Sequence, residues 1–253
     1  MELRGKTVIL TGASSGIGLA LARLLAKENV NLALVARRAD ILARLAEELK
    51  DSGSAVFPFK CDVSKREEIQ NACREVQSRF GPVDIAILNA GVAYRGGVDP
   101  FNVEAAREIF AVNVFGVIDF IGEFLPDFKR RGEGLIVGVS SLADTRPLPR
   151  NGFYSGSKSA LTYILNALRL EMKKHGVKVI TVRPGFVKSA MTEKNTYPMP
   201  FMVTAEKAAA IILKGIKKGK THIAFPFPMA AGARFVKFIP NVLYEPIASR
   251  IKK

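Results

Sequence analysis

Thr7-Val8-Ile9-Leu10-Thr11-Gly12-Ala13-Ser14-Ser15-Gly16-Ile17-Gly18 is the stretch of this sequence that decides the fold. Its first four residues read as a buried strand, and residues 19–29 follow with a helical pattern of apolar side chains. A strand, a glycine-rich turn and a helix in this order bring backbone N–H groups and the positive end of a helix to one point, where a pyrophosphate can bind. We expect Gly12 to make the tight turn, Gly16 to admit a cofactor and Gly18 to let the helix pack on the strand. The spacing is Gly-x-x-x-Gly-x-Gly and not the common Gly-x-Gly-x-x-Gly, so an ordinary glycine-rich turn is the alternative.

Strand-like and helix-like segments alternate along most of the remaining chain. Near-continuous apolar strands separated by helices predict a parallel sheet that is covered on both faces, here a doubly wound α/β fold of about seven strands. We expect one domain over residues 1–225, with residues 226–253 as a basic amphipathic extension of that domain. The expected strands are 7–10, 31–35, 55–59, 83–88, 135–139, 177–182 and 221–225, and the expected helices are 19–29, 41–50, 65–80, 101–128, 153–174 and 205–218.

Composition places the chain among ordinary soluble proteins, because 48% of its 253 residues are hydrophobic and 24% are charged. Cys61 and Cys73 lack zinc-type spacing, which favours free thiols in a reducing compartment. The first residues lead directly into a strand, so we expect no signal peptide and a cytoplasmic protein. The net charge of +15 attracts anionic partners. No nucleic-acid motif accompanies the charge, and we expect no nucleic-acid partner.

Arg37 and Arg38 follow the second expected strand, where a unit of this kind selects its dinucleotide. An acidic residue there binds the ribose hydroxyls of NAD, whereas an arginine accommodates the 2′-phosphate of NADP. The arginines therefore predict NADP(H), the alternative being that both are only solvated. Asp40 is a candidate ribose ligand, but it directly precedes the helix 41–50, and N-capping is the simpler explanation.

Tyr154 and Lys158 lie four residues apart at the start of the expected helix 153–174. Residues at this spacing share one helical face, so a phenol and an ammonium group would meet there. A nearby positive charge lowers the pKa of a phenol, and a tyrosine with a lowered pKa can exchange a proton with a substrate oxygen. Alone the pair is a weak signal, since an exposed Tyr–Lys pair arises often by chance.

Taken together, these motifs resemble those of the short-chain dehydrogenases/reductases. The resemblance covers about residues 5–225 and implies NAD(P)-dependent reduction of carbonyls or oxidation of alcohols, without a metal, by a homodimer or homotetramer. Because all four residues of the family's catalytic tetrad have a match in this sequence, the alternative of a protein that senses a dinucleotide but catalyses no reaction is disfavoured. The matching residues are Thr11–Gly18, Asn89-Ala90-Gly91, Asn113, Ser141, Tyr154 with Lys158, and Pro184-Gly185.

The resemblance implies a catalytic role for four residues. Tyr154 resembles the family's general acid/base, and Lys158 resembles the residue that tunes it and bonds the nicotinamide ribose. Ser141 resembles the serine that holds the substrate oxygen. We choose it over Ser140 because the family places this serine thirteen positions before the tyrosine. Asn113 resembles the asparagine that holds a water leading to the lysine, the alternative being a structural capping amide.

The resemblance also implies a set of cofactor contacts. Asp62 resembles an adenine contact, although it equally suits the N-cap of the next helix. Thr192 resembles the threonine that bonds the nicotinamide carboxamide, and Ser189 is the alternative for that role. The full set is Gly12, Ser14, Ser15, Gly16, Ile17, Gly18, Arg37, Arg38, Asp62, Val63, Asn89, Ala90, Gly91, Tyr154, Lys158, Pro184, Gly185, Val187 and Thr192.

The substrate and the function of the chain's end stay open at this point. Residues 189–202 carry apolar side chains that indicate an apolar part of a substrate, or that pack against the protein itself. Arg95 and Arg146 suit an anionic group or face water. Residues 227–253 combine aromatic and basic side chains, and Pro240 and Pro246 interrupt the segment, which argues against a single spanning helix. This segment either lies on an anionic membrane, in an oxidoreductase that acts on a lipid-linked substrate, or packs within the protein or an oligomer.

Overall fold

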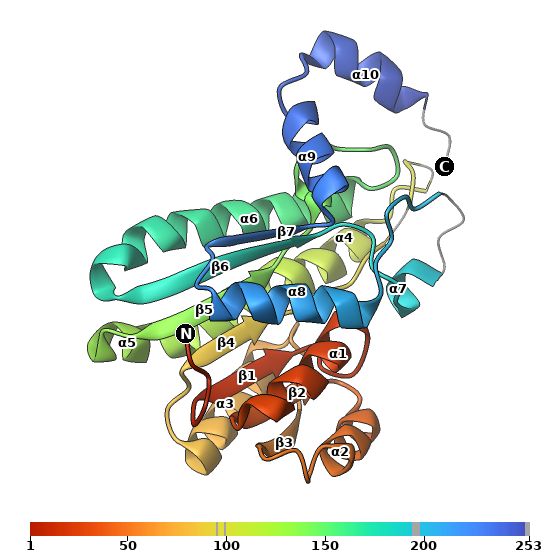
Figure 1. Ribbon diagram of the computed structural model, residues 1–253. Helices are drawn as coiled ribbons and strands as arrows, with labels where there is room; N and C mark the ends of the chain where they lie inside the picture. Colours follow the sequence, from red (N-terminus) through yellow and green to blue (C-terminus); the bar gives the residue numbers. More distant parts are fainter. Residues whose placement is uncertain (95, 99, 194–197, 251–253) are drawn as a thin grey trace.

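Seven parallel strands form one sheet in the computed structural model, in the order β3-β2-β1-β4-β5-β6-β7 (Figure 1). The structure describes residues 1–94, 96–98, 100–193 and 198–250. The doubly wound α/β fold expected from the sequence is confirmed. The strands are β1 (Thr7–Thr11), β2 (Asn31–Ala36), β3 (Ala55–Lys60), β4 (Ile85–Leu88), β5 (Gly134–Val139), β6 (Val177–Pro184) and β7 (His222–Phe225).

The strand β1 lies in the middle of the sheet, between β2 and β4. Its Leu10 pairs in register with Leu34 of β2 and with Ile87 of β4. The chain winds outward from β1 to β3 and then returns to the other side of β1 at β4, so the winding direction reverses between β1 and β4. In open sheets of this type, ligands bind outside the carboxyl ends of the strands at that reversal.

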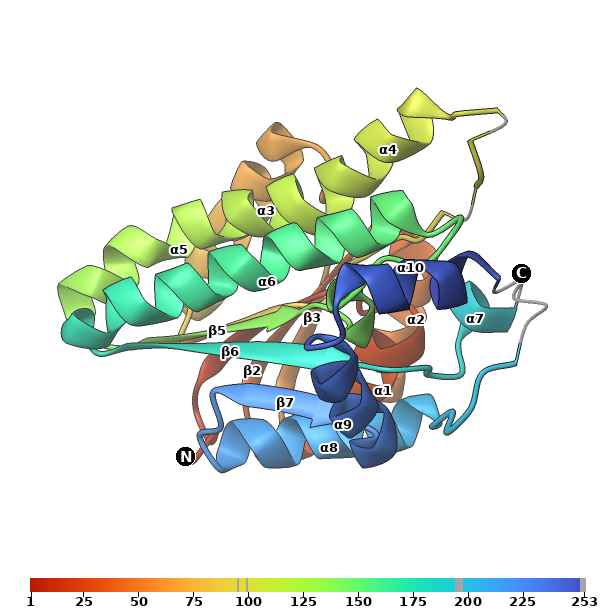
Figure 2. The same cartoon turned by 90° about the horizontal axis from the view of Figure 1, so that it is seen from above.

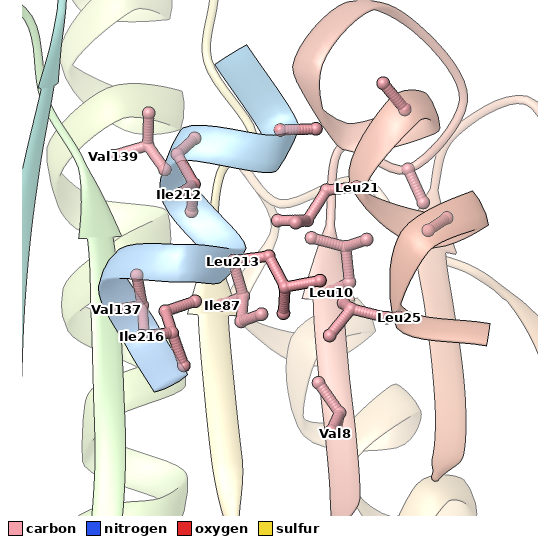
Figure 3. Packing of buried hydrophobic residues seen from close by; sticks show 14 of the residues in the cluster. Val8, Leu10, Leu21, Leu25, Ile87, Val137, Val139, Ile212, Leu213 and Ile216 are labelled. Carbon is pink, nitrogen blue, oxygen red and sulfur yellow. The ribbon is translucent and has the colours of Figure 1, made fainter. Parts of the chain in front are cut away.

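Helices cover both faces of the sheet (Figure 2). One face packs against α1, α2 and α8, and the other against α3, α5 and α6, each over its own apolar core. Figure 3 shows Leu213 of α8 between Leu21 and Leu25 of α1 and Ile212 and Ile216 of α8, next to Leu10 of the sheet. The helices that flank the sheet are α1 (Gly16–Leu25), α2 (Ala39–Glu48), α3 (Arg66–Phe80), α4 (Val103–Phe110), α5 (Gly116–Arg131), α6 (Gly152–Met172) and α8 (Ala205–Lys217).

The expected continuous helix over residues 101–128 differs from the structure. It consists of α4 and α5 joined by a π-helical turn, Ala111–Phe115, and it ends at Arg131. A π turn inserts an extra residue into the hydrogen-bond ladder, and such turns are frequent at functional sites. Asn113 lies inside this turn.

By length and composition, the helical stretch Val103–Arg131 is apolar enough to cross a membrane. Its side chains Phe120, Phe124 and Phe128 are buried among the sheet-facing residues. A core helix of a globular domain therefore explains its apolar character.

Residues 226–250 form two helices, α9 (Phe227–Val236) and α10 (Asn241–Ser249), which extend from the end of β7 (Figure 1). Pro240 precedes α10, whereas Pro246 lies inside it. A short helix α7 (Ala190–Glu193) follows β6. The cysteines Cys61 and Cys73 are both buried free thiols.

Candidate active site at the carboxyl edge of the sheet

The glycine-rich turn has the geometry that its three glycines predict. Gly12 adopts φ +69° and Gly16 φ +54°, a left-handed conformation that other residues rarely adopt. A Cβ on Gly18 would lie 2.2 Å from the carbonyl oxygen of Gly12, so α1 begins directly against the end of β1. Ser15 precedes α1 and its side chain makes no capping hydrogen bond, which leaves the first amides of this helix to a ligand or to water.

Arg37 and Arg38 lie exposed at the end of β2, beside the glycine-rich turn. The guanidinium of Arg38 donates to the hydroxyl of Ser14 at 3.0 Å and to its carbonyl at 3.2 Å. Arg37 lies close enough to Asp62 to contribute to the lowered pKa of that carboxyl group. Two guanidinium groups therefore flank the place where the adenosine end of a dinucleotide would lie.

Neither Asp40 nor Asp62 caps a helix, so the capping role expected of Asp40 is wrong and the capping alternative for Asp62 is excluded. Asp40 does not precede its helix, because α2 begins at Ala39, and its carboxylate pairs with Arg44 within the helix at 2.9 Å. Asp62 does not cap α3, for which Lys65 occupies the N-cap position. The carboxylate of Asp62 instead accepts hydrogen bonds from the amide and hydroxyl of Ser64, at 3.0 and 2.8 Å. This turn holds Asp62 after β3, on the same edge as the arginines.

Asn89, Ala90 and Gly91 join the end of β4 to β1. The hydroxyl of Thr11 accepts from the amides of Asn89 and Ala90, each at 3.0 Å, and the Asn89 side chain donates to the Thr11 carbonyl at 3.0 Å. These bonds fix the switch point between the two strands. Val63, after β3, is buried, and its carbonyl oxygen lies against Gly116.

Tyr154 and Lys158 lie on one face at the start of α6, as predicted. The ammonium nitrogen of Lys158 is 5.9 Å from the centre of the Tyr154 ring. Lys158 is 4% exposed, and its Nζ donates to the carbonyl of Val139 at 2.9 Å, at the end of β5. Burial lowers the pKa of this amine to about 8, while the carboxylate of Asp144 acts in the opposite direction.

Asn113 is fully buried and clamps the π turn to its neighbours. Its amide oxygen accepts from the Val92 N–H, and its amide nitrogen donates to the Val92 carbonyl, both at 2.9 Å. A second donor bond, 3.0 Å long, reaches the hydroxyl of Ser157, which itself donates to the Tyr154 carbonyl. A Cβ on Gly91 would lie 3.2 Å from Asn113 Oδ1 and 3.3 Å from Lys158 Nζ, so the amide and the amine meet at this glycine.

Ser141 and Ser140 make different contacts, and these distinguish the two candidates. The hydroxyl of Ser140 is committed to the Lys158 carbonyl at 2.9 Å and to Thr162 at 2.7 Å. The hydroxyl oxygen of Ser141 accepts from the Ala143 amide at 3.1 Å, and its nearest acceptor, the Pro184 carbonyl, is 3.5 Å away. Because its own proton has only this long contact, Ser141 is the better donor for a substrate oxygen.

The segment after β6 closes over the glycine-rich turn. The amide of Gly185 donates to the Phe225 carbonyl at 2.7 Å, and Val187 bridges to Val203. The hydroxyl of Thr192 donates to the carbonyl of Val187 or of Ser189 within the same segment. A Cβ on Gly16 would lie 3.3 Å from the Cβ of Ser189, which brings Ser189 nearer to that turn than the sequence indicated.

Two structural residues of the site, Ser157 and Arg183, escaped the sequence interpretation. Ser157 connects Asn113 to Tyr154, and Asp144 pairs with Arg183 at the turn that follows Ser141. No local motif marks these residues, because their partners lie on other elements. Arg146 is partly exposed, and its guanidinium donates to the Ile239 carbonyl and lies 4.8 Å from the Tyr244 ring of α10. Arg95, and residues 194–197 of the apolar segment, lie outside the described residues.

A dinucleotide fits the chemistry of this edge. The uncapped amides at the start of α1 and the guanidinium groups of Arg37 and Arg38 are donors that suit phosphate groups. The buried amine of Lys158 lies where the carboxyl ends of β4 and β5 meet. Within the described part of the chain, no group of His, Cys, Asp and Glu residues is arranged to hold a metal ion.

Comparison with known proteins identifies the family. The profile of the short chain dehydrogenase family matches residues 6–199. An uncharacterized oxidoreductase of Myxococcus xanthus is 35% identical over 251 residues, which is 99% of each chain. An alcohol dehydrogenase from Thermococcus sibiricus, solved with 5-hydroxy-NADP, is 30% identical with a TM-score of 0.79, over 88% of this chain and 96% of its own.

A short-chain dehydrogenase/reductase from Burkholderia phymatum, solved with NAD, shares the fold with a TM-score of 0.87 at 23% identity, over 97% of this chain and 96% of its own. The chain thus belongs to the short-chain dehydrogenase family, and it is an oxidoreductase that uses a nicotinamide cofactor.

Proposed function

We propose that this protein is an NADP(H)-dependent oxidoreductase that interconverts a carbonyl group and an alcohol. The observation that carries the proposal is the buried amine of Lys158 beside the Tyr154 ring, at the carboxyl ends of the central strands. A charged amine at this distance favours the ionised phenol, which brings the tyrosine into the range for acid/base chemistry.

Several residues of this chain have distinct roles in the proposed proton transfer. Tyr154 donates its phenolic proton to the substrate oxygen during reduction and accepts it during oxidation. Ser141 donates a second hydrogen bond to the same oxygen, where negative charge grows, and a fixed donor of this kind stabilises the transition state. Asn113 holds the start of α6 through Ser157, so it keeps Tyr154 and Lys158 in place. The cofactor, when bound, supplies or accepts the hydride.

We assign the cofactor's phosphates to the start of α1 and to the arginines after β2. The guanidinium groups present planar donors that suit the 2′-phosphate of NADP better than a ribose hydroxyl. The alcohol dehydrogenase from Thermococcus sibiricus supports this assignment, since it was solved with a derivative of NADP. Ser189 or Thr192 would hold the carboxamide end, and Asp62 with Val63 the adenine.

The substrate class follows from the residues around the site. Met191, Phe201 and Met202, in the segment after β6, are 44%, 60% and 40% exposed, so this segment offers apolar side chains to a ligand. We propose a ketone, aldehyde or secondary alcohol with an apolar portion as the substrate. A homodimer or homotetramer is supported by exposed apolar side chains along the outer helices, namely Phe115, Ile118, Tyr163 and Leu170.

The test is a screen of ketones, aldehydes and alcohols with NADPH and NADP, followed by two variants on α6. Tyr154→Phe removes the proton donor, and we expect kcat to fall by roughly 10²–10⁴-fold while NADPH still binds. Tyr163→Phe is the matched control, because Tyr163 is 75% exposed on the same helix. A Tyr154→Phe enzyme that retains the wild-type kcat would overturn the assignment.

A second candidate function is that of a peripheral membrane enzyme acting on a lipid-soluble carbonyl or alcohol. The observation that favours it is a surface of α9 and α10 that we call the tail patch, with exposed apolar residues Phe227, Phe235, Phe238, Val242, Leu243 and Ile247. The same helices carry exposed Arg234, Lys237 and Arg250. Aromatic and cationic side chains on one surface suit the headgroup region of an anionic bilayer.

A further inference from the structure

An ion pair between the buried Asp144 carboxylate and Arg183 lies at the turn that follows Ser141, on residues that the proposed acid/base chemistry does not use. The side chain of Asp144 is 2% exposed and pairs with Arg183 of β6. Its Oδ2 accepts from Arg183 Nε at 2.7 Å and from the hydroxyl of Thr162 at 2.6 Å. Its Oδ1 accepts from Arg183 and from Thr145. Every acceptor of this carboxylate is therefore engaged, as a buried charge requires.

The ion pair connects three elements that carry the site. Asp144 ends the short 3₁₀ turn Leu142–Asp144, for which Ser141 is the N-cap, and the Asp144 amide donates to the Ser141 carbonyl at 3.2 Å. Thr162 and Ser159 of α6 donate to the Asp144 side chain and main-chain carbonyl, respectively. The turn is thereby fastened to the helix that carries Tyr154 and Lys158, and to β6 through Arg183.

The directions of these hydrogen bonds follow from proton counting. A carboxylate can only accept, so the single proton of Thr162 points at Asp144. The 2.7 Å contact between Thr162 and Ser140 then takes its proton from Ser140, which also lies 2.9 Å from the Lys158 carbonyl. The hydrogen-bond chain Asp144–Thr162–Ser140 thus runs from the turn after Ser141, through α6, to Ser140 directly after β5.

We propose that Asp144, held by Arg183 and Thr162, is a positioning residue that sets the spacing between Ser141 and the Tyr154–Lys158 pair. The role rests on the proposed function, because it matters only if these groups act on one substrate oxygen. A displacement of about 1 Å between such donors can cost on the order of 10²-fold in rate. Asp144 also supplies a negative charge that acts on Lys158, and the Tyr154 ring lies beside the same amine.

The test uses a pair of variants at Thr162, with Asp144→Asn as a third. Thr162→Val removes the donor while preserving shape, and we expect kcat to fall about 10-fold or more with KM and the NADPH Kd within about threefold. Thr162→Ser keeps the hydroxyl and is expected to stay within about twofold of wild type. Asp144→Asn is expected to lower kcat further. Asp127→Asn is the control, since it breaks a pair with Arg131 near the start of β4, at the opposite edge of the sheet.

A second measurement does not depend on catalysis. Amide hydrogen exchange over residues 141–145 should accelerate in Thr162→Val and Asp144→Asn and stay unchanged in Thr162→Ser and Asp127→Asn. Wild-type kcat and wild-type exchange in folded Thr162→Val would overturn the positioning role while leaving the reductase proposal intact. A wild-type enzyme that turns over no carbonyl or alcohol would instead overturn the proposed function. If Asp144→Asn does not fold, the Thr162 pair still decides the matter.

Discussion

Lys158 is costly to bury, and it lies beside Tyr154, which we propose as the acid/base residue. Its amine is buried, and burial lowers its pKa to about 8 from an ordinary 10.5. Its Nζ donates to the Val139 carbonyl, and Asp144 offsets part of the effect of burial on its pKa. The amine remains mostly protonated at neutral pH, which is the state that favours an ionised Tyr154.

The lowered pKa of Lys158 predicts a pH dependence of stability. Between about pH 8 and 10.5, the unfolded chain holds a proton that the folded chain has lost, so the free energy of unfolding rises with pH. Below that window both states are protonated and the full penalty is present, on the order of 3 kcal/mol. Urea unfolding of the cofactor-free protein should show this rise, and Lys158→Met should lack it. Equal slopes in the two proteins would show that burial does not depress this pKa.

Arg37 is expected to decide the choice between NADPH and NADH. Arg37 is exposed after β2, and its charge acts on Asp62, which lies after β3. Arg37→Ala should lower kcat/KM for NADPH by about 10–100-fold, because it removes a charge-assisted hydrogen bond to the 2′-phosphate. The kcat/KM for NADH should stay nearly unchanged. Arg44→Ala is the control, because Arg44 is exposed on α2 and pairs with Asp40. A wild type that prefers NADH would refute the NADP assignment outright.

Residue spacing predicted the Tyr154–Lys158 face because both residues lie on one helix. It could not predict the partners of Asn113 or the Asp144–Arg183 pair, whose members are 39 positions apart and meet only after the sheet forms. The assignment of Asp40 as an N-cap failed for a related reason. The helix α2 begins one residue earlier than Asp40, and an i, i+4 pair with Arg44 satisfies the carboxylate within the helix.

At the scale of elements, the turn between β1 and α1 depends on close backbone contact. Gly18→Ala would place a Cβ 2.2 Å from a backbone oxygen of Gly12, which cannot move without shifting β1. We expect a loss of about 2–3 kcal/mol in the free energy of unfolding, together with weaker NADPH binding. Gly122→Ala is the matched control, since nothing lies within 4 Å of its Cβ position in α5. That change should stabilise the helix by about 0.5–1 kcal/mol.

The strands were predictable as elements because their near-continuous apolar sequences can only be buried in a sheet covered on both faces. The π turn at Ala111–Phe115 was not, because its sequence continues the helical pattern of α4 and α5. Tertiary contacts favour the π turn, because the extra residue turns Asn113 toward Val92 and Ser157, with which its side chain forms hydrogen bonds. The prolines at 240 and 246 argued against a single spanning helix, but they did not reveal that α10 would accommodate Pro246.

At the scale of the whole molecule, the net charge of +15 and the tail patch both favour binding to an anionic surface. Glu245 is the only acidic residue in the sequence of α9 and α10, whereas Arg234, Lys237 and Arg250 are exposed there. Two copies that met through this patch would bring like charges together, which opposes association. An anionic bilayer satisfies both the cations and the aromatic rings.

The tail patch therefore predicts binding to vesicles that contain phosphatidylserine and much weaker binding to pure phosphatidylcholine. Replacing Phe227, Phe235 and Phe238 by serine should lower the fraction that floats with vesicles about 10-fold or more, because each ring gives up apolar contact. Arg234→Gln with Lys237→Gln should weaken flotation more than Lys207→Gln with Lys218→Gln on α8, although both pairs lower the net charge equally. If the triple serine variant floats with vesicles as the wild type does, the tail patch is not a membrane surface. The same holds if flotation is unchanged and only the molar mass measured by light scattering changes. The second result would assign it to contact between subunits, in spite of its charge.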